Sequence, residues 1–252
     1  MAHRDEIVAH LDRLLDAASW DDYGPNGLQV IGRDEVELVV TGVSAHRDLF
    51  ERAAEAGAGM VLCHHGIFWR STPQAVGAQM KGRLRALFDA DMSLVAYHLP
   101  LDAHEELGNN ALICEALGLR KGERFADHGG KAIGFVGEAE EPIALEQFAD
   151  RCASAFGREP LLLPGGAEQV SRVGIVSGGG AGNLAEAAAL GLDALVTGEA
   201  EEPSMADAAE TGVSLLACGH YATETVGIRR LGEAVAERFG VAHTFIELPS
   251  PV

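Results

Sequence analysis

The stretch Met60-Val61-Leu62-Cys63-His64-His65-Gly66-Ile67-Phe68-Trp69 decides the fold of the chain around it. A short apolar run that ends in polar residues and a glycine is typical of a buried strand at its carboxyl end. Open α/β sheets bind their ligands at that edge. Because successive strand side chains point to opposite faces, His64 and His65 can serve two neighbouring ions only if the backbone turns, which Gly66 permits. The alternative is a pair of histidines that cap the strand end by hydrogen bonds to the backbone.

The segments on either side of this strand predict a sheet with helical crossovers. Strands are expected at 36–43, 60–63 and 93–98, and helices at 46–57 and 77–90. This β-α-β-α-β spacing is the pattern of a parallel sheet. We therefore predict an α/β fold.

The second half of the chain repeats the first. A shift of 134 positions lays residues 50–57 over 184–191 and places His64-His65 over Gly198-Glu199. The helical part of this match is rich in alanine and glycine and is weak by itself. A shift of 122 positions then lays 97–102 over 219–224, so that both halves end a strand with the pattern His-x-x-x-acid. The repeated pattern at matching places predicts two similar α/β units that form a pseudo-repeat.

We place the boundary of these two units in the charged, glycine-rich stretch 120–130. The first unit, 1–125, carries the HHG and HLPLD motifs. The second unit, 126–252, carries the TGE and GHYATE motifs, and its C-terminal part is able to pack back onto the first. We expect mostly parallel sheets in both units and a metal site in the cleft between them.

The composition excludes several classes of function. The chain has 252 residues, of which 47% are hydrophobic, and its four cysteines form no C-x-x-C pair and are expected in the core. It has 19 basic and 38 acidic residues, and a net charge of −19 repels phosphate backbones, so nucleic acid is not an expected partner. No apolar run approaches the roughly 20 residues that span a bilayer, and no apolar secretory signal is visible at the N-terminus. We expect a cytoplasmic protein without membrane contact.

Two His-x-x-x-acid motifs supply the chemistry that His64-His65 alone does not. Pro100 is tolerated in the first turn of a helix, so His98 is expected to end a strand and Asp102 to lie in the first helical turn. The alternative is an acidic residue placed there only because the helix dipole favours it. His220 and Glu224 likewise precede a helix. Imidazoles and carboxylates that all follow the carboxyl ends of strands suit a pair of divalent ions of the Zn, Mn, Fe or Co class.

The motifs HHGIFW, YHLPLD, TGE and GHYATE, with the early NGLQV, resemble the Nif-three-like, YbgI-type family of GTP cyclohydrolase type 2 homologues. The resemblance covers nearly the whole chain, in order, in the short form without an inserted domain. It implies a dinuclear metal centre, with two divalent ions per chain, and a toroidal homohexamer. It also implies that Glu224 bridges the ions and that His98 supports the ligands or moves protons. Carried over motif by motif, the metal ligands are His64, His65, Asp102, His220 and Glu224.

The chain departs from this family at one place, and one of its loops has two possible roles. After Thr197-Gly198-Glu199 many relatives have histidines, whereas this chain has Ala200-Glu201-Glu202-Pro203, so a role carried by those histidines does not transfer. The loop Ser177–Gly182 follows an expected strand and opens a helix. Its N–H groups either hold a phosphate or form a tight turn packed against the site.

Two functions fit these observations. The first is a two-metal hydrolase of a nucleotide or related small molecule, GTP cyclohydrolase-like by resemblance, in which His98 or Glu199 moves protons. The second is a non-enzymatic metal-binding ring that buffers metal or serves as an interaction scaffold. An open coordination position in a pocket of substrate size would favour the first function.

Overall fold

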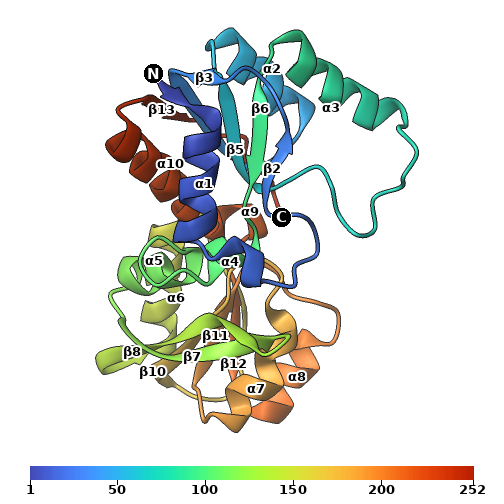
Figure 1. The fold of residues 1–252 in the computed structure, drawn as a ribbon. Coiled ribbons are helices and arrows are strands. Elements are labelled where there is room, and N and C mark those ends of the chain that lie inside the picture. Colours follow the sequence, from blue (N-terminus) through green and yellow to red (C-terminus); the bar gives the residue numbers. More distant parts are fainter. The chain divides into compact units, whose positions relative to one another are not determined.

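The computed structural model describes residues 1–252 and confirms the α/β class. The chain forms two compact units, each shown with its helices and strands in Figure 1. The first unit consists of Met1–Leu101 and Gly227–Leu248. The second unit consists of Asp102–Val226 and Pro249–Val252. None of the helices is long and apolar enough to cross a bilayer.

The first unit is built on a five-stranded sheet of order β13-β4-β5-β6-β2. The strands β13, β4, β5 and β6 run parallel, and β2 is antiparallel to β6. Helices follow β4 and β5, so the predicted β-α-β-α-β unit is confirmed. A short antiparallel pair, β1 and β3, lies outside this sheet. The elements are β1 (Ala2–His3), α1 (Arg4–Leu14), η1 (Ala17–Ser19), β2 (Gly27–Val30), β3 (Glu35–Val36), β4 (Leu38–Ser44), α2 (Arg47–Glu55), β5 (Met60–His65), α3 (Ala78–Asp89), β6 (Ser93–Ala96), α10 (Thr225–Phe239) and β13 (Ala242–Phe245).

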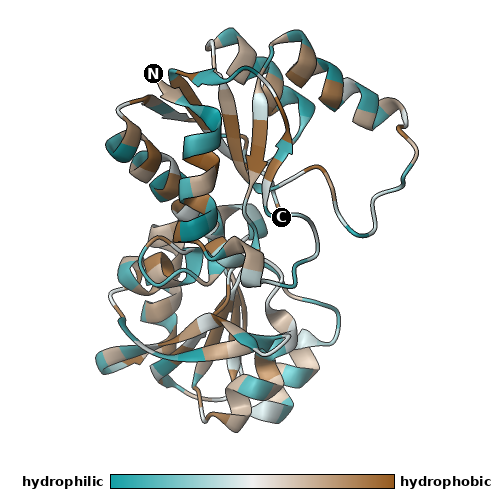
Figure 2. Ribbon diagram, viewed as in Figure 1, coloured by the Kyte–Doolittle hydropathy of each residue, from teal (hydrophilic) through white to brown (hydrophobic).

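The central strand of the first unit is buried on both faces. Every residue from Met60 to Cys63 is fully buried, which is typical of a parallel strand covered by helices on each side. The buried cluster of this unit includes Leu49 and Phe50 of α2, Leu87 of α3 and Leu94 of β6. Figure 2 shows hydrophobic residues along the strands and hydrophilic residues spread over the helices. Burial of these apolar side chains fixes β5 in the middle of the sheet, and with it the place where His64 and His65 emerge.

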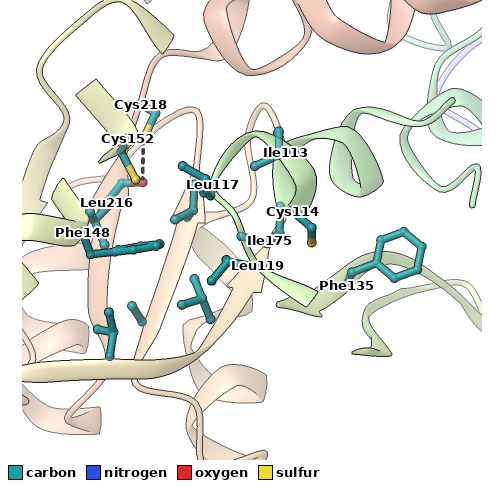
Figure 3. Packing of buried hydrophobic residues seen from close by; sticks show 14 of the residues in the cluster. Ile113, Cys114, Leu117, Leu119, Phe135, Phe148, Cys152, Ile175, Leu216 and Cys218 are labelled. Carbon is teal, nitrogen blue, oxygen red and sulfur yellow. Dashed lines mark hydrogen bonds between the residues drawn. The ribbon is translucent and has the colours of Figure 1, made fainter. Parts of the chain in front are cut away.

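The second unit is built on a six-stranded mixed sheet of order β7-β8-β10-β11-β12-β9. The strands β10, β11 and β12 run parallel, whereas β8 and β9 are antiparallel to their neighbours β10 and β12. Figure 3 shows part of its core, where Phe148 and Cys152 of α6 lie close to Leu216 and Cys218 at the end of β12. Helix α4 (Leu99–Asp102) begins in the first unit and ends at the first residue of the second. The other elements of the second unit are α5 (Asn109–Ala116), β7 (Arg120–His128), β8 (Lys131–Ala144), α6 (Leu145–Phe156), β9 (Leu161–Leu163), β10 (Gln169–Ile175), η2 (Ala181–Asn183), α7 (Leu184–Ala189), β11 (Ala194–Thr197), α8 (Ser204–Thr211), β12 (Ser214–Ala217) and α9 (His220–Thr223).

The two sheets share one pattern of strands. The order β4-β5-β6-β2 in the first unit and the order β10-β11-β12-β9 in the second each contain three parallel strands followed by one antiparallel edge strand. A helix connects the first two parallel strands in each case. The units differ at the other edge, where β4 pairs with parallel β13 and β10 pairs with antiparallel β8. Superposition of the two units as a repeat stays a prediction.

The stretch 120–130 is not the boundary segment that its charges and glycines indicated. It forms β7 and the turn of an antiparallel hairpin with β8. Gly129 and Gly130 both adopt positive φ, which a tight hairpin turn requires, and Phe125 is buried while most charged neighbours face solvent. The division of the chain into its two units therefore differs from a boundary between 125 and 126. It falls after Leu101 and again after Val226, because α10 and β13 return to the first unit and β13 pairs with β4.

Candidate metal centre

Three histidines cluster at the carboxyl edge of the first unit's sheet. His64 and His65 end β5, and His98 lies two residues beyond the end of β6. These strands are parallel neighbours with Cys63 opposite Ala96, so their carboxyl ends meet. The ring centroids are 4.7 Å apart for His64 and His65, 5.0 Å for His64 and His98, and 5.5 Å for His65 and His98. One nitrogen of each ring lies within 4.8 Å of the others, close enough for three imidazoles to share an ion or serve two.

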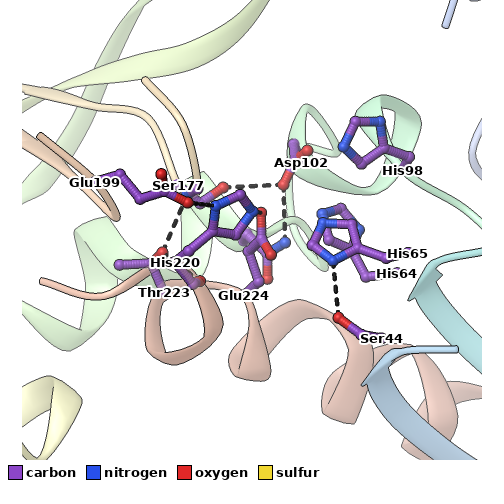
Figure 4. A network of polar contacts seen from close by, with 12 residues as sticks. Ser44, His64, His65, His98, Asp102, Ser177, Glu199, His220, Thr223 and Glu224 are labelled. Carbon is purple, nitrogen blue, oxygen red and sulfur yellow. Dashed lines mark hydrogen bonds and ion pairs between the residues drawn. The ribbon is translucent and has the colours of Figure 1, made fainter. Parts of the chain in front are cut away.

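Backbone and side-chain partners hold the Nδ1 atom of each of these three histidines. The Nδ1 of His64 lies 2.9 Å from the carbonyl oxygen of Tyr97, which only accepts, so Nδ1 carries the proton and Nε2 keeps its lone pair. The Nδ1 of His98 lies 2.7 Å from a carboxylate oxygen of Asp22, with the same consequence. The Nδ1 of His65 is hydrogen-bonded to Ser44 Oγ at 3.1 Å (Figure 4). Such partners orient histidines that bind metals and fix their tautomer.

Asp22 contacts the histidine cluster, and no motif in the sequence identifies it. It lies in a segment dense in turn formers, where an aspartate carries no special signal. Its carboxylate accepts hydrogen bonds from the His98 ring, from the Leu99 N–H at 2.9 Å and from the Asn26 amide at 2.9 Å. Burial alone would raise the pKa of Asp22, but the hydrogen bond and charge of His98 outweigh it, and the pKa lies below its ordinary value. Asp22 is therefore a carboxylate at neutral pH and holds the His98 ring in place.

In the second unit, His220 lies between two glutamates. The Nε2 of His220 is 3.2 Å from Glu224 Oε1, and its Nδ1 is hydrogen-bonded to Glu199, which lies two residues beyond the end of β11 (Figure 4). Burial lowers the pKa of His220, but the two carboxylates outweigh burial and raise the pKa to about 9. Without metal this imidazole is therefore protonated at neutral pH, and a cation that binds it must displace the proton.

Asp102 lies in the first turn of α4, as Pro100 predicted. One of its carboxylate oxygens accepts hydrogen bonds from Ser177 Oγ at 2.9 Å and from the Asn109 amide at 2.8 Å (Figure 4). The N–H of Ser177 in turn donates to Asn110 Oδ1 at 2.7 Å. Neither Ser177 nor the two asparagines form a motif with Asp102 in the sequence, so only the structure identifies them as its support.

The glycine loop after β10 packs directly against the pair formed by His220 and Glu224. Gly178 has a φ of +62°, and a Cβ built on it would lie 2.4 Å from Glu224 Oε1 and 3.1 Å from His220 Nε2. Its N–H donates to Thr223 Oγ1 at 3.1 Å, and its carbonyl accepts from the N–H of Glu199 at 3.0 Å. Of the two alternatives for this loop, the structure supports the tight turn packed on the site.

Comparison with known proteins places the chain in a family. Residues 2–251 match the Duf34/NIF3 family, described as NGG1p interacting factor 3. The chain belongs to the Duf34/NIF3 family. The resemblance that the motifs indicated is thereby confirmed. A GTP cyclohydrolase 1 type 2 homolog of Pseudomonas aeruginosa is 42% identical over 245 residues, which are 97% of each chain. A protein of the same name from Deinococcus radiodurans is 40% identical over 247 residues, 98% of this chain and 94% of the relative.

Two solved structures have the same fold as this chain. A structure titled protein ybgI, of unknown function, superposes with a TM-score of 0.94 at 37% identity and covers 99% of this chain and 100% of its own. A protein of Thermus thermophilus superposes with a TM-score of 0.90 at 34% identity and covers 99% and 100%. These structures support the fold and the family.

This Duf34/NIF3 protein brings the sequence-predicted residues together in two sets. The first unit holds His64, His65 and His98, and the second unit holds Asp102 and the His220–Glu224 pair, with Glu199 on the same imidazole. Their roles as ligands or proton carriers stay predictions. Ala200, which follows the TGE motif, packs against the second unit's core.

Proposed function

We propose that this protein binds two divalent metal ions and uses them to hydrolyse a nucleotide or a related small molecule. The observation that carries the proposal is the cluster of His64, His65 and His98, in which the Tyr97 carbonyl holds the His64 ring through its Nδ1 and the Asp22 carboxylate holds the His98 ring. Neutral imidazoles suit the borderline metals Zn, Mn, Fe and Co. The name shared by the Pseudomonas aeruginosa and Deinococcus radiodurans relatives supports a nucleotide-like substrate.

The second set supplies the carboxylates that a pair of divalent ions needs. We assign Asp102, His220 and Glu224 to the same centre as His64 and His65, on the strength of the family resemblance. Their chemistry fits, because carboxylate oxygen and imidazole nitrogen are both ligands of this metal class. Asp102 is oriented by Ser177 and Asn109. Such support of ligating groups is typical of built metal sites.

When bound, the ions would activate water as a nucleophile and stabilise the negative charge that develops on the substrate. The chain's own residues position these groups and move protons. Asp22 holds His98 with its Nδ1–H donated, which leaves Nε2 able to take up or release a proton near the reacting centre. Glu199 accepts from Nδ1 of His220 and so directs the Nε2 of that ring toward Glu224. This position suits Glu199 to orient His220.

Metal analysis of purified protein tests the proposal. We expect close to two divalent ions per chain, and fewer in the variants His65→Ala and Glu224→Ala. His128→Ala, at the end of β7, is the matched control and should keep the full metal content. Protein that stays metal-free on titration with Zn, Mn and Fe would refute the site. A screen of hydrolase substrates with and without chelator then tests catalysis, and metal without any activity would favour the metal-binding ring.

We also propose that the protein assembles as a homohexamer. This rests on the family resemblance and on a composition that leaves few basic residues to form ion pairs between subunits. Subunits with a net charge of −19 each would meet through apolar and neutral surfaces, as permanent homo-oligomers do.

A further inference from the structure

A cleft of about 520 Å³ opens on the first unit beside the histidine cluster. Its walls come from the segment around Trp20–Asn26 and from Phe68–Arg70, with Asp12 of α1 at one side. The Arg70 N–H donates to the Tyr23 carbonyl at 2.7 Å, which joins the two segments. The volume is in the range of small-molecule sites, which are about 300–1,000 Å³.

Aromatic rings form much of the wall. Trp20, Phe68 and Trp69 all line the cleft, and each is only half-buried. The chain has two tryptophans, and both are here. Large aromatic faces left open in a concave site favour a flat ring, because stacking on tryptophan or phenylalanine stabilises planar heterocycles of many kinds.

The polar part of the wall is acidic. Asp12, Asp21 and Asp22 line the cleft, and the one cation, Arg70, is paired with Asp21. The cleft therefore carries a net negative charge, which repels phosphate groups. The Asp22 carboxylate is buried and already accepts from His98, Leu99 and Asn26, so the exposed Asp21 is the acid that a ligand can reach. A carboxylate accepts hydrogen bonds and donates none, so Asp21 favours a ligand whose ring carries N–H or amino groups.

The cleft shares residues with the histidine cluster. The Trp69 ring meets the His98 ring edge-on at 5.2 Å between centroids and lies 5.9 Å from the His65 ring. Asp22 and Asn26, which line the cleft, also hold His98 through its Nδ1 and its backbone N–H. A second, narrow recess is lined by Asn26 and Trp69 together with His64 and His98. A ring bound in the cleft would therefore lie next to the imidazoles of the candidate metal centre.

We infer that this cleft binds a planar, uncharged or cationic nitrogen heterocycle, such as a purine nucleoside, against Trp20 and Trp69, and that it discriminates against phosphorylated forms. The inference rests on the proposed function for the reaction that follows binding, and within that function it favours unphosphorylated small molecules over nucleotides. Binding itself depends on the aromatic and acidic walls and needs no metal.

Intrinsic fluorescence tests the inference, because both tryptophans of the chain lie in the cleft. Guanosine and guanosine 5′-triphosphate are titrated into the full-length protein at low salt, with ribose as the control that lacks a ring. We expect saturable quenching by guanosine, none by ribose, and at least tenfold weaker binding of the triphosphate. Trp20→Leu keeps an apolar side chain but loses the aromatic face, and should weaken guanosine binding about tenfold. Asp21→Asn removes one exposed acidic group, and should improve triphosphate binding severalfold with little effect on guanosine.

Metal content measured on the same samples separates this inference from the proposed function. Guanosine binding by protein that stays metal-free on titration with Zn, Mn and Fe would support the cleft and refute the metal centre. Protein with two ions whose fluorescence does not respond to guanosine would overturn the cleft and leave the metal centre standing. A triphosphate that binds as tightly as guanosine, or a Trp20→Leu variant with unchanged affinity, would also overturn the inference.

Discussion

Gly178 offers a sharp test of the candidate site, because replacing it by alanine acts on Glu224 without removing any ligand. The new Cβ would lie 2.4 Å from Glu224 Oε1, whereas ordinary contacts begin near 3.4 Å, so the carboxylate must retreat by about 1 Å (3.4 − 2.4). That movement takes Oε1 out of its position 3.2 Å from His220 Nε2. The φ of +62° adds about 1–2 kcal/mol of strain for a residue with a Cβ.

We expect Gly178→Ala to lower the affinity for divalent metal at least tenfold, about 1.4 kcal/mol, and to lower the free energy of unfolding by about 1–2 kcal/mol. Titration calorimetry of metal into chelator-treated protein measures the first quantity, and urea denaturation measures the second. Gly179→Ala is the matched control, since no heavy atom lies within 4 Å of its Cβ. The shorter side chain in Glu224→Asp should make the alanine at 178 less damaging. Unchanged metal affinity in Gly178→Ala would refute the assignment of Glu224 as a ligand.

Three further predictions concern stability and assembly. Gly232→Ala in α10 places a Cβ 2.2 Å from His243 Nε2 and should lower the free energy of unfolding by about 1–3 kcal/mol, more than the roughly 1 kcal/mol that alanine's helix preference adds. Gly82→Ala in α3 is the control, because its nearest contact is at 3.6 Å, and it should not lower the melting temperature. Burial holds the pKa of His243 below 6.5, so the unfolded chain binds more protons and the free energy of unfolding should fall as pH drops through about 6.5. Denaturation at pH 8 and at pH 5.5 should show that His243→Gln loses less stability over this range than the unchanged protein, and an equal loss would contradict this reasoning. Light scattering at low and moderate salt should show a hexamer that is tighter at moderate salt, and a 26.5 kDa monomer under both conditions would remove the proposed ring.

Local sequence patterns were sufficient for the elements that carry the candidate ligands. The apolar run before His64 and the glycine after His65 predicted the strand and its end, and both are where the structure has them. Pro100 placed Asp102 in a first helical turn for a steric reason that depends on neighbouring residues alone.

Other features depended on where the backbone goes after these elements form. The charge-rich segment 120–128 forms a strand by pairing with β8. The segment 242–245 belongs to the first unit because β4 offers it an open edge. Strand pairing of this kind joins residues far apart in the chain, and local propensity does not specify the partner.

The support of the candidate ligands was also decided by tertiary structure. Asp22 reaches His98 across 76 residues, and Ser177 reaches Asp102 across 75. These separations along the chain are too long to belong to any local sequence motif. The sequence by itself determined which residue types stand at the strand ends, because strand burial and turn sterics act over a few neighbouring residues. Only the folded backbone decided which carboxylates and hydroxyls orient them, because a hydrogen bond needs two groups within about 3 Å, however far apart they lie in the chain.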